Sequence, residues 1–473
     1  MAYPNFDRAA ATALGAALRR SGFNEPALSE MLGDDAWGND PVDVAVHERR
    51  LAPTRLGTVA RALFLQLPVE RERLVGALGQ RAVDALFTIE IAEPGETIRP
   101  RARIMPVGEL LVLADDHPPP SADVPRDYVA AYTPTSRLCD CLTPRRRGER
   151  VLDVGTGSGV QAILAARHAS HVIATDVNPR ALAFADTNAA LNGFTNVETR
   201  RGSFFDAVEG ERFDLITCNT PYVVSPENRF EYRDSGLRGD EVTQLVMRSA
   251  AEHLADDGYA TMTGSWLGDD EESADQRPYD WAKGLRACDA WILSVWESDP
   301  LEHAASWNRE HADEPEQLAE AITSWSGYLD ELNAGWVSEG VIALHKRPGK
   351  RHGVRVDGID EDGLDEAGDQ VRRAFENRAR LTTTDLLDER PALALRVELE
   401  HELGPRGRAE ARVQLVEGTS STIETTPAAL AIVERLDGKT KLRRLLRNAD
   451  DGTRRASVRL VRELAELGAL RLR

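Results

Sequence analysis

VLDVGTGSG, residues 151–159, joins an apolar run to a loop that has glycine at every second position. The apolar run predicts a β-strand, and Gly155, Gly157 and Gly159 allow the backbone to turn sharply and to approach a ligand closely. The residues that follow predict a helix, whose positive N-terminal end then points at the same place. The stretch therefore predicts an α/β fold with a site for a nucleotide or a nucleotide-like cofactor.

Two positions discriminate between the possible cofactors. A dinucleotide fingerprint needs glycine at position 160, where this chain has Val160, and Asp153 already stands before the loop. This favours S-adenosylmethionine over NAD, with Asp153 facing the amino-acid part of the cofactor or its bound water. Asp176 ends the next apolar run, HVIATD, and is placed to accept both ribose hydroxyls. Thr156, Val177 and Asn219 complete the expected contacts with the cofactor. The alternative is that Asp153 and Asp176 only cap helices in a fold that binds another ligand.

Strand-like and helix-like segments alternate on both sides of the loop. From residue 149 the chain reads ERVLDV, VQAILAARHA, HVIATDV, PRALAFADTNAALNG, a third short strand and FDLITCN. Three later apolar runs, at 259–263, 290–296 and 340–345, supply the last strands, and the acidic run 269–272 reads as a loop. This alternation predicts a Rossmann-like, mostly parallel sheet of seven strands with helices on both faces.

The fourth strand ends in Asn219-Thr220-Pro221-Tyr222. With VLDVGTGSG, the ATD that ends at Asp176 and the following Asn178-Pro179, this motif resembles the class I methyltransferases of the release-factor glutamine N5-methyltransferase type. The same family includes enzymes that methylate exocyclic base amines. The resemblance runs from about Tyr128 to Gly258 and implies the class I fold and S-adenosylmethionine. The family pattern is Asn-Pro-Pro-Tyr, and this chain has threonine at the second position.

The chemistry of a planar nitrogen explains the catalytic residues that the motif predicts. The lone pair of an amide or aryl amine is tied up in resonance, so the nitrogen must be held and aimed. Asn219 is expected to accept one N–H through its side-chain oxygen, and the Thr220 carbonyl accepts the other. Pro221 stiffens the turn and Tyr222 lies against the flat group. Such a reaction requires no metal. The alternative is a simple turn at the end of a strand.

Three further segments have two interpretations each. Ser203 stands where the family has a carboxylate for adenine, with Phe204 to pack on the base; Asp206 is the alternative acceptor. Residues 132–136 (YTPTS) either lie over the methionine end of the cofactor or only begin a helix. In the segment 232–240, Arg233, Asp234 and Arg238 either contact the substrate or are ordinary loop charges.

Composition and breaks in pattern divide the chain into three predicted domains, 1–120, 121–348 and 349–473. Prolines mark the first seam near 115–121, and glycine and charge mark the second at 347–369. In the first domain, helices precede strand-like runs at 86–92 and 110–113, which suggests a winged-helix-like unit. The last domain ends in helices at 426–436, 442–447 and 454–467 and a strand at 469–472, which suggests another.

The chain is acidic, with a formal net charge of −20, yet basic residues concentrate on the last two predicted helices. These residues are Lys439, Lys441, Arg443, Arg444, Arg447, Arg454, Arg455, Arg459 and Arg462. They either pair with the acidic methyltransferase domain or bind nucleic acid, a peptide or a protein. Seven of the eight tryptophans lie between Trp266 and Trp336, in the core or as an aromatic substrate wall.

The motifs predict an enzyme. We expect it in the cytoplasm, because the chain lacks a bilayer-length apolar run and begins without a secretory signal. The leading hypothesis is an S-adenosylmethionine-dependent N-methyltransferase that acts on an amide nitrogen of a protein or peptide, without a metal or a membrane. The first alternative is methylation of an exocyclic amine of an RNA or DNA base. The second is a non-catalytic regulator that binds S-adenosylmethionine or DNA.

Overall fold

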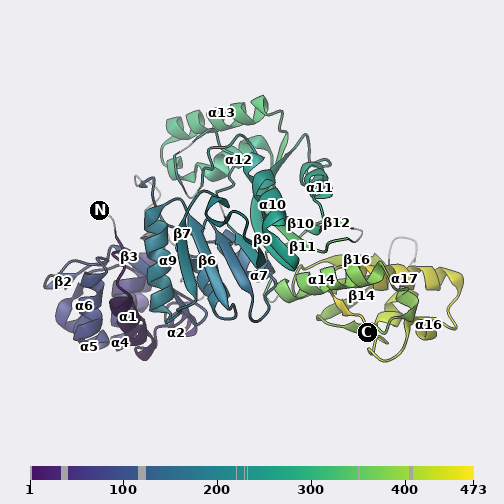
Figure 1. The fold of residues 1–473 in the computed structure, drawn as a ribbon, viewed down its shortest axis with the longest axis horizontal. Helices are drawn as coiled ribbons and strands as arrows, with labels where there is room; N and C mark the ends of the chain where they lie inside the picture. The colour runs from purple at the N-terminus through teal and green to yellow at the C-terminus, as the bar shows by residue number, and fades with distance from the viewer. Residues whose placement is uncertain are drawn as a thin grey trace.

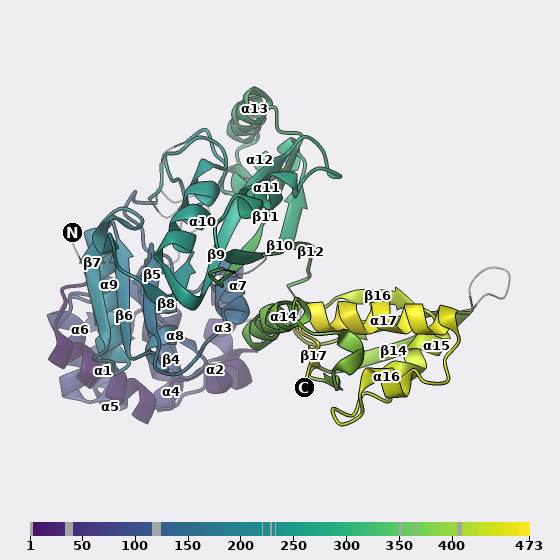
Figure 2. The ribbon, with the colours of Figure 1, turned by 45° about the vertical axis from the view of Figure 1, so that its right-hand side comes forward.

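The computed structural model describes residues 3–33, 41–115, 124–219, 221–227, 229–231, 233–349, 352–361, 363–365, 367–403 and 409–473. A central sheet separates an N-terminal unit from a C-terminal unit that extends to the opposite side (Figure 1; Figure 2). The predicted seam at 116–121 lies outside the described residues. Among the residues that the structure describes, no helix is long and apolar enough to cross a bilayer.

The central sheet has the strand order β12-β10-β11-β9-β8-β5-β6-β7. Its strands are β5 (Arg150–Val154), β6 (His171–Asp176), β7 (Val197–Arg201), β8 (Phe213–Cys218), β9 (Leu254–Gly268), β10 (Cys288–Ser298), β11 (Trp336–Lys346) and β12 (Val354–Gly358). Only β11 runs antiparallel to its neighbours among these described strands. This confirms the predicted mostly parallel, Rossmann-like sheet and its last three strands.

The prediction of seven strands is wrong, because β12 adds an eighth. It lies inside the predicted linker 347–369 and pairs in parallel with β10, from Ala290 opposite Val354 to Ser294 opposite Gly358. An edge strand pairs on one side only and tolerates charged side chains, so its apolar pattern is weak. Arg355 and Asp357 form an ion pair on this strand. The charge and glycine that suggested a linker are therefore features of an edge strand.

Helices cover both faces of the sheet. Neighbouring residues of β5 point to opposite faces and therefore pack in two different hydrophobic cores. Val151 packs in one core with residues of α7 and α8, whereas Leu152 and Val154 pack in another with residues of α10. The helices of this part are α7 (Pro134–Leu142), α8 (Val160–Ala166), α9 (Pro179–Leu191), α10 (Glu241–His253), α11 (Gln276–Lys283), α12 (Pro300–Trp307) and α13 (Pro315–Glu331). Helices α12 and α13 form an insertion between β10 and β11.

The N-terminal unit packs on α9. It comprises α1 (Arg8–Arg20), α2 (Glu25–Leu32), α3 (Pro41–Arg50), α4 (Arg55–Val59), α5 (Arg71–Leu78), α6 (Gln80–Thr88), β1 (Val69–Glu70), β2 (Thr97–Ile98) and the hairpin β3 (Ala102–Val107) to β4 (Leu110–Asp115). The predicted strand at 86–92 is wrong, since α6 continues to Thr88 and buries Ala82, Val83 and Leu86 on one side. The predicted strand at 110–113 is confirmed as part of β4.

The C-terminal unit joins the sheet through α14 (Ala367–Leu381). Its other elements are β13 (Ala392–Leu393), β14 (Val397–Leu403), β15 (Ala409–Leu415), β16 (Thr422–Thr425), α15 (Pro427–Val433), α16 (Leu442–Leu445), α17 (Asp451–Glu466) and β17 (Leu470–Arg471). The three predicted helices and the final strand are confirmed. The winged-helix assignments of both end units and the three domain boundaries remain predictions.

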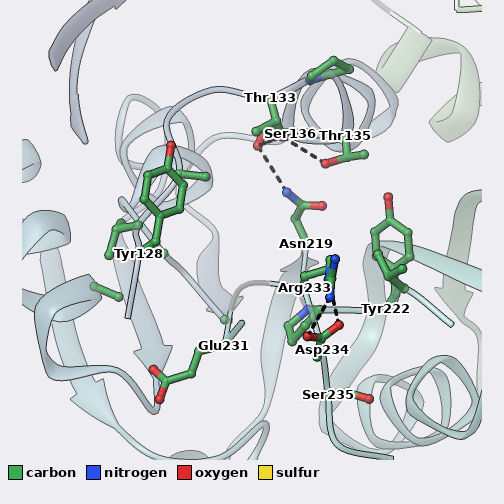
Figure 3. A pocket seen from close by; sticks show the side chains of 18 of the residues that line it. Tyr128, Thr133, Thr135, Ser136, Asn219, Tyr222, Glu231, Arg233, Asp234 and Ser235 are labelled. Atoms are coloured by element: carbon green, nitrogen blue, oxygen red, sulfur yellow. Dashed lines mark hydrogen bonds and ion pairs between the residues drawn. The ribbon is translucent and has the colours of Figure 1, made fainter. Parts of the chain in front are cut away.

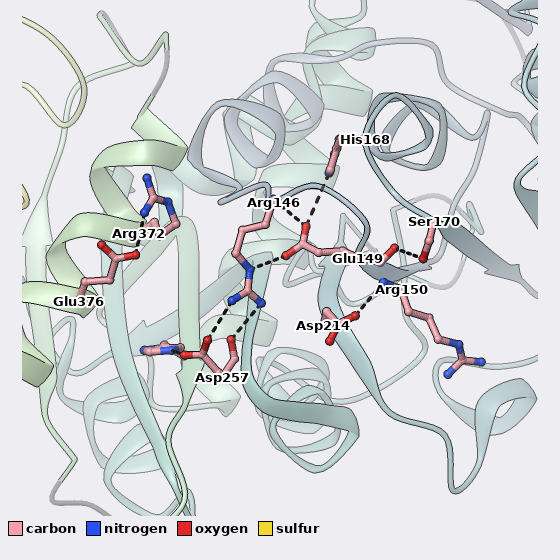
Figure 4. Close-up of polar contacts among 10 residues, drawn as sticks. Arg146, Glu149, Arg150, His168, Ser170, Asp214, Asp257, Arg372 and Glu376 are labelled. Carbon is pink, nitrogen blue, oxygen red and sulfur yellow. Dashed lines mark hydrogen bonds and ion pairs between the residues drawn. The ribbon is translucent and has the colours of Figure 1, made fainter.

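Apolar and ionic contacts meet where α14 reaches the sheet. His345 stacks on Tyr259, with ring centroids 4.3 Å apart, and Phe375 of α14 lies against both rings. Next to these rings, Arg146 bridges Glu149 and Asp257, as Figure 4 shows. The C-terminal unit is therefore packed against the central sheet and shares a continuous core with it.

Candidate cofactor and acceptor site

A cavity of about 1220 Å³ lies at the carboxyl ends of the parallel strands. This is where open α/β sheets bind their ligands, because the loops that follow the strands meet there. The cavity is lined by most of the predicted cofactor residues, namely Asp153, Gly155, Thr156, Gly157, Asp176, Val177, Ser203, Phe204 and Asn219. Pro221 and Tyr222 of the acceptor motif line it as well. The fold therefore brings both predicted motifs to one cavity.

The glycine loop and Asp176 lie together on the cavity wall and form the predicted nucleoside cradle. Gly157 has a φ of +54°, and a Cβ atom at this position would meet no protein atom within 4 Å, so the backbone borders open space. The Asp176 carboxylate accepts hydrogen bonds from Gly157 N and Asn178 N, both at 2.9 Å. A carboxylate has about four lone-pair sites, so these two bonds leave it able to accept further hydrogen bonds. Burial raises the pKa of Asp176, against the effect of these bonds.

Gly159 has a different position from the other two glycines. It is not part of the cavity wall and caps α8 in the left-handed conformation, with a φ of +83°. A Cβ atom here would lie 2.7 Å from Ala185 Cα on α9. The contact predicted between Gly159 and the cofactor remains a prediction, and the structure itself gives this glycine a role in helix packing. Glycine is needed at this position because α8 and α9 approach each other closely.

Asp153 is fully buried beneath the loop. Its carboxylate accepts hydrogen bonds from Thr156 Oγ1 at 2.6 Å and Thr217 Oγ1 at 3.0 Å. Burial raises the pKa of Asp153 to about 6, although both hydroxyl contacts lower it. The residue thus ties the cofactor loop to β8, and its predicted role toward the amino-acid part of the cofactor remains a prediction.

Ser203 and Phe204, the residues predicted to contact adenine, follow β7 and line the cavity. Phe204 has a φ of +46°, and its carbonyl oxygen accepts a hydrogen bond from Thr175 Oγ1 at 3.4 Å. Asp206, the alternative acceptor, does not line the cavity. Of the two interpretations, the geometry favours Ser203 with Phe204.

Asn219 is held in a fixed orientation at the end of β8. Its Nδ2 donates to Ser136 Oγ at 3.2 Å (Figure 3). Its Oδ1 accepts from Thr263 Oγ1 at 2.8 Å. Tyr222 is buried, and its carbonyl accepts a hydrogen bond from Ser265 Oγ. Thr220 lies outside the described residues. The acceptor motif is therefore anchored to α7 and β9.

The segment at 132–136 begins a helix, as one of its two interpretations has it, and its place over the methionine end of the cofactor remains a prediction. Thr133 is the N-cap of α7 and accepts a hydrogen bond from Ser136 N at 3.2 Å. Thr133, Pro134, Thr135 and Ser136 also line the cavity. The helix entry is thus part of the wall above Asn219.

The charges after the acceptor motif are largely paired with one another. Arg233 pairs with Asp234 at 2.9 Å and with Glu227 at 2.6 Å, and both Arg233 and Asp234 line the cavity. Arg238 does not line the cavity. Tyr232, the first residue of this predicted segment, lies outside the described residues. The structure thus separates Arg233 and Asp234 from Arg238.

The sequence did not predict the position of one wall of the cavity, which is formed by β11 and by the insertion between β10 and β11. Glu339, His303 and Trp307 line this wall, together with Trp296 of β10. Trp307 Nε1 donates to Glu339 Oε1 at 2.9 Å. The concentration of tryptophans in this part of the chain was the available signal, but it also covers Trp266, Trp291 and Trp325, which are fully buried in the core.

Comparisons with known proteins agree with this site. A family model described as a methyltransferase domain matches residues 145–319. The ribosomal protein uL3 glutamine methyltransferase of Xanthomonas campestris pv. campestris is 36% identical over 255 residues, which are 50% of this chain and 75% of that protein. The release factor glutamine methyltransferase of Xylella fastidiosa is 34% identical over 129 residues, which are 25% of this chain and 47% of that protein.

The chain thus spans about half the length of the release factor relative that it matches. Among solved structures, a methyltransferase from Pyrococcus furiosus aligns at 20% identity over 46% of this chain and 83% of that chain, with a TM-score of 0.29. S-adenosylmethionine is the cofactor of this class. The cradle between Gly157 and Asp176 has the open backbone and the carboxylate that the nucleoside of this cofactor needs. The chain belongs to the class I S-adenosylmethionine-dependent methyltransferases, in the family of the release factor and ribosomal protein glutamine methyltransferases.

Proposed function

We propose that this chain transfers the methyl group of S-adenosylmethionine to a planar amide nitrogen of a protein or peptide, with the side-chain amide of glutamine as the acceptor. The observation that carries the proposal is the placement of Asn219. It lies in the same cavity as the nucleoside cradle, and two hydrogen bonds, from Thr263 and to Ser136, fix its side chain. Relatives named as glutamine methyltransferases support the choice of acceptor.

Residues of the cradle would hold the cofactor. Asp176 accepts hydrogen bonds from the ribose hydroxyls, Gly155 and Gly157 allow the backbone to approach, and Phe204 packs on adenine beside Ser203. When bound, S-adenosylmethionine supplies an electrophilic methyl group on a sulfonium centre. The remaining contributions come from the protein, which must hold the acceptor nitrogen in line and exclude water.

Asn219 is suited to holding an acceptor N–H. An amide oxygen has two lone pairs, and Thr263 Oγ1 uses one of those on Asn219 Oδ1, so one remains for the substrate. The Thr220 carbonyl is proposed to take the second N–H. Pro221 limits the conformations of the turn, and Tyr222 offers a flat face to the amide. The nitrogen can lose its proton to water after transfer, so no strong base is required.

The test measures cofactor binding and methyl transfer separately. Calorimetry with S-adenosylmethionine should show binding to the wild type and to Asn219→Ala. Transfer of a tritiated methyl group into the protein fraction of a nuclease-treated cell extract should occur with the wild type and fall by at least a hundredfold with Asn219→Ala. Binding that is absent from the wild type would exclude both enzyme hypotheses and favour a non-catalytic chain. Full transfer by the variant would refute the role of Asn219.

A base amine of a nucleic acid is the second candidate acceptor, and the surface of α17 favours it. Arg454, Arg455, Arg459 and Arg462 line a groove of about 410 Å³ on this helix. Within the described ranges of the chain, the basic cluster forms ion pairs with Asp385, Asp388 and Glu466, all in the C-terminal unit. Among the described residues, these contacts do not support pairing of the cluster with the methyltransferase domain. Retention on a polyanion column that is lost in an Arg455→Glu, Arg459→Glu variant would support this candidate.

A further inference from the structure

The wall that contains Glu339 lies beyond the place where the cofactor is expected. In the sheet order, β11 is separated from β5 by β9 and β8. At about 4.8 Å between neighbouring strands, Glu339 lies about 14 Å across the sheet from the strand that begins the cofactor loop. The acceptor motif follows β8, and so lies between the two. The cavity therefore has a second end, on the far side of the methylated nitrogen.

The second end is bounded by acidic and aromatic side chains. Trp296 of β10 is the cross-strand partner of Glu339 on β11, so both side chains leave the sheet on the same face. Trp307 and Glu302 of α12 complete this wall. Ser265, the neighbour of Glu339 on β9, donates to the carbonyl oxygen of Tyr222. The wall is therefore next to the acceptor motif.

Within the part of the chain that the structure describes, no positively charged side chain pairs with Glu339. The side chain is nine-tenths buried, and its Oε1 accepts the Trp307 N–H, while no described residue hydrogen-bonds its Oε2. His303 Nδ1 is 3.7 Å from Oε1, but its Nε2 bonds the Val224 carbonyl, and burial lowers the pKa of His303 to about 4, so the ring is neutral. A buried carboxylate without a cationic partner is costly. Burial accordingly raises the pKa of Glu339 to about 7.

The residues that line the cavity as a whole also have a net negative charge. Seven carboxylates and three arginines line it. One of these arginines, Arg233, is already paired with Asp234 and Glu227. Such a lining attracts a cation and repels a phosphate group. Tryptophan faces add a cation–π attraction when the cation is desolvated.

We propose that the end of the cavity walled by Glu339, Trp296 and Trp307 is a subsite for a cationic side chain, a guanidinium or an ammonium group, carried by the methyl acceptor close to the methylated nitrogen. The cation pairs with Glu339 Oε2 and lies against the indole rings. The substrate is therefore a basic peptide segment, an inference that rests on the proposed transfer to a protein amide. The subsite also selects against nucleic acid as the acceptor.

The test uses a set of short peptides that contain one glutamine and one arginine, one to three residues apart in either order. A matched set has citrulline in place of arginine, which keeps the shape and removes the charge. Binding to the full chain is measured by calorimetry in the presence of S-adenosylhomocysteine, so that no turnover is needed. The best arginine peptide should bind at least tenfold more tightly than its citrulline counterpart.

Two variants assign this preference to the subsite. Glu339→Gln keeps the acceptor for Trp307 and should reduce the preference to less than twofold. Glu320→Gln, an exposed glutamate on α13 that does not line the cavity, should leave it unchanged. Unaltered binding of S-adenosylhomocysteine to Glu339→Gln shows that the site is folded.

Binding and turnover on the same peptides separate this inference from the proposed function. Equal affinity for arginine and citrulline peptides, or a preference that survives Glu339→Gln, overturns the subsite. Competition between a short single-stranded RNA and the arginine peptide overturns it as well. If arginine-dependent binding is found but no peptide is methylated, the subsite stands and the proposed transfer to glutamine falls. If peptides are methylated without an arginine preference, the proposed transfer to glutamine stands and the subsite falls.

Discussion

The hydroxyl of Thr263 on β9 donates a hydrogen bond of 2.8 Å to the side-chain oxygen of Asn219 at the end of β8. The two residues belong to adjacent parallel strands, and Thr263 is buried. This bond leaves one lone pair of the amide oxygen for a substrate and fixes the direction in which it points. A buried residue that does not line the cavity therefore holds the proposed catalytic amide in its orientation.

We predict that Thr263→Val lowers kcat about tenfold and leaves the affinity for S-adenosylmethionine unchanged, because only the orientation of Asn219 is lost. Thr261→Val is the matched control. Thr261 is also buried on β9, and its hydroxyl has no hydrogen-bond partner among the described residues, so this variant should keep full activity. Equal loss in both variants, measured by methyl transfer and calorimetry, would contradict the positioning role.

Asp176 is expected to dominate cofactor affinity through its charge. We predict that Asp176→Asn raises the Kd for S-adenosylmethionine at least tenfold, since charge-assisted bonds to the ribose hydroxyls weaken. Asp206→Asn should leave the Kd unchanged, because Asp206 is exposed and does not line the cavity. Calorimetry measures both values. A larger effect at Asp206 than at Asp176 would reverse the assignment of the nucleoside cradle.

Two glycines of the cofactor loop should respond differently to the same substitution. Gly159→Ala is expected to lower the free energy of unfolding by about 2 kcal/mol or more, because the new methyl group meets Ala185 and the backbone stays in the left-handed region. Gly157→Ala costs about 1 kcal/mol of backbone strain but places a methyl group in the cavity. It should therefore weaken cofactor binding more than it weakens the fold. Denaturant unfolding measures the stability of both variants, and calorimetry measures their affinity for the cofactor. If both variants lose stability and affinity to the same extent, the different roles given to Gly157 and Gly159 are contradicted.

The buried carboxyl of Glu339 predicts a pH dependence of stability. Its pKa in the folded chain is about 7, above the ordinary 4.5, so the folded state retains the proton when the unfolded state has lost it. Stability due to this group is therefore full below about pH 4.5 and is lost as the pH rises through 7, by up to about 3 kcal/mol. Glu339→Gln should remove this loss, and the difference from wild type should grow between pH 5 and pH 8 in denaturant unfolding. A difference that does not vary with pH would show that Glu339 is charged throughout.

The site residues that directly follow the predicted strands could be placed from the local sequence pattern. The glycine loop, Asp176 and Asn219 each come directly after an apolar run, and parallel strands place their carboxyl ends at one edge of a sheet. Alternation of strands and helices was sufficient to predict that edge. For these residues, order along the chain and the geometry of a parallel sheet are enough to bring them into one cavity.

Other features depend on contacts between segments that are distant in sequence. The role of Gly159 is set by Ala185 on the next helix, and β12 exists as a strand because β10 offers an unpaired edge. Glu339 meets Trp296 and Trp307 through strand register and an insertion, and neither has a local signature. The periodicity of a sequence reports which side of an element is apolar, but the partner of that side is determined by packing. The end of the cavity with the glycine loop and Asp176 could therefore be predicted from the sequence. The end with Glu339 is determined by the tertiary structure, because strand pairing and an insertion bring its residues together.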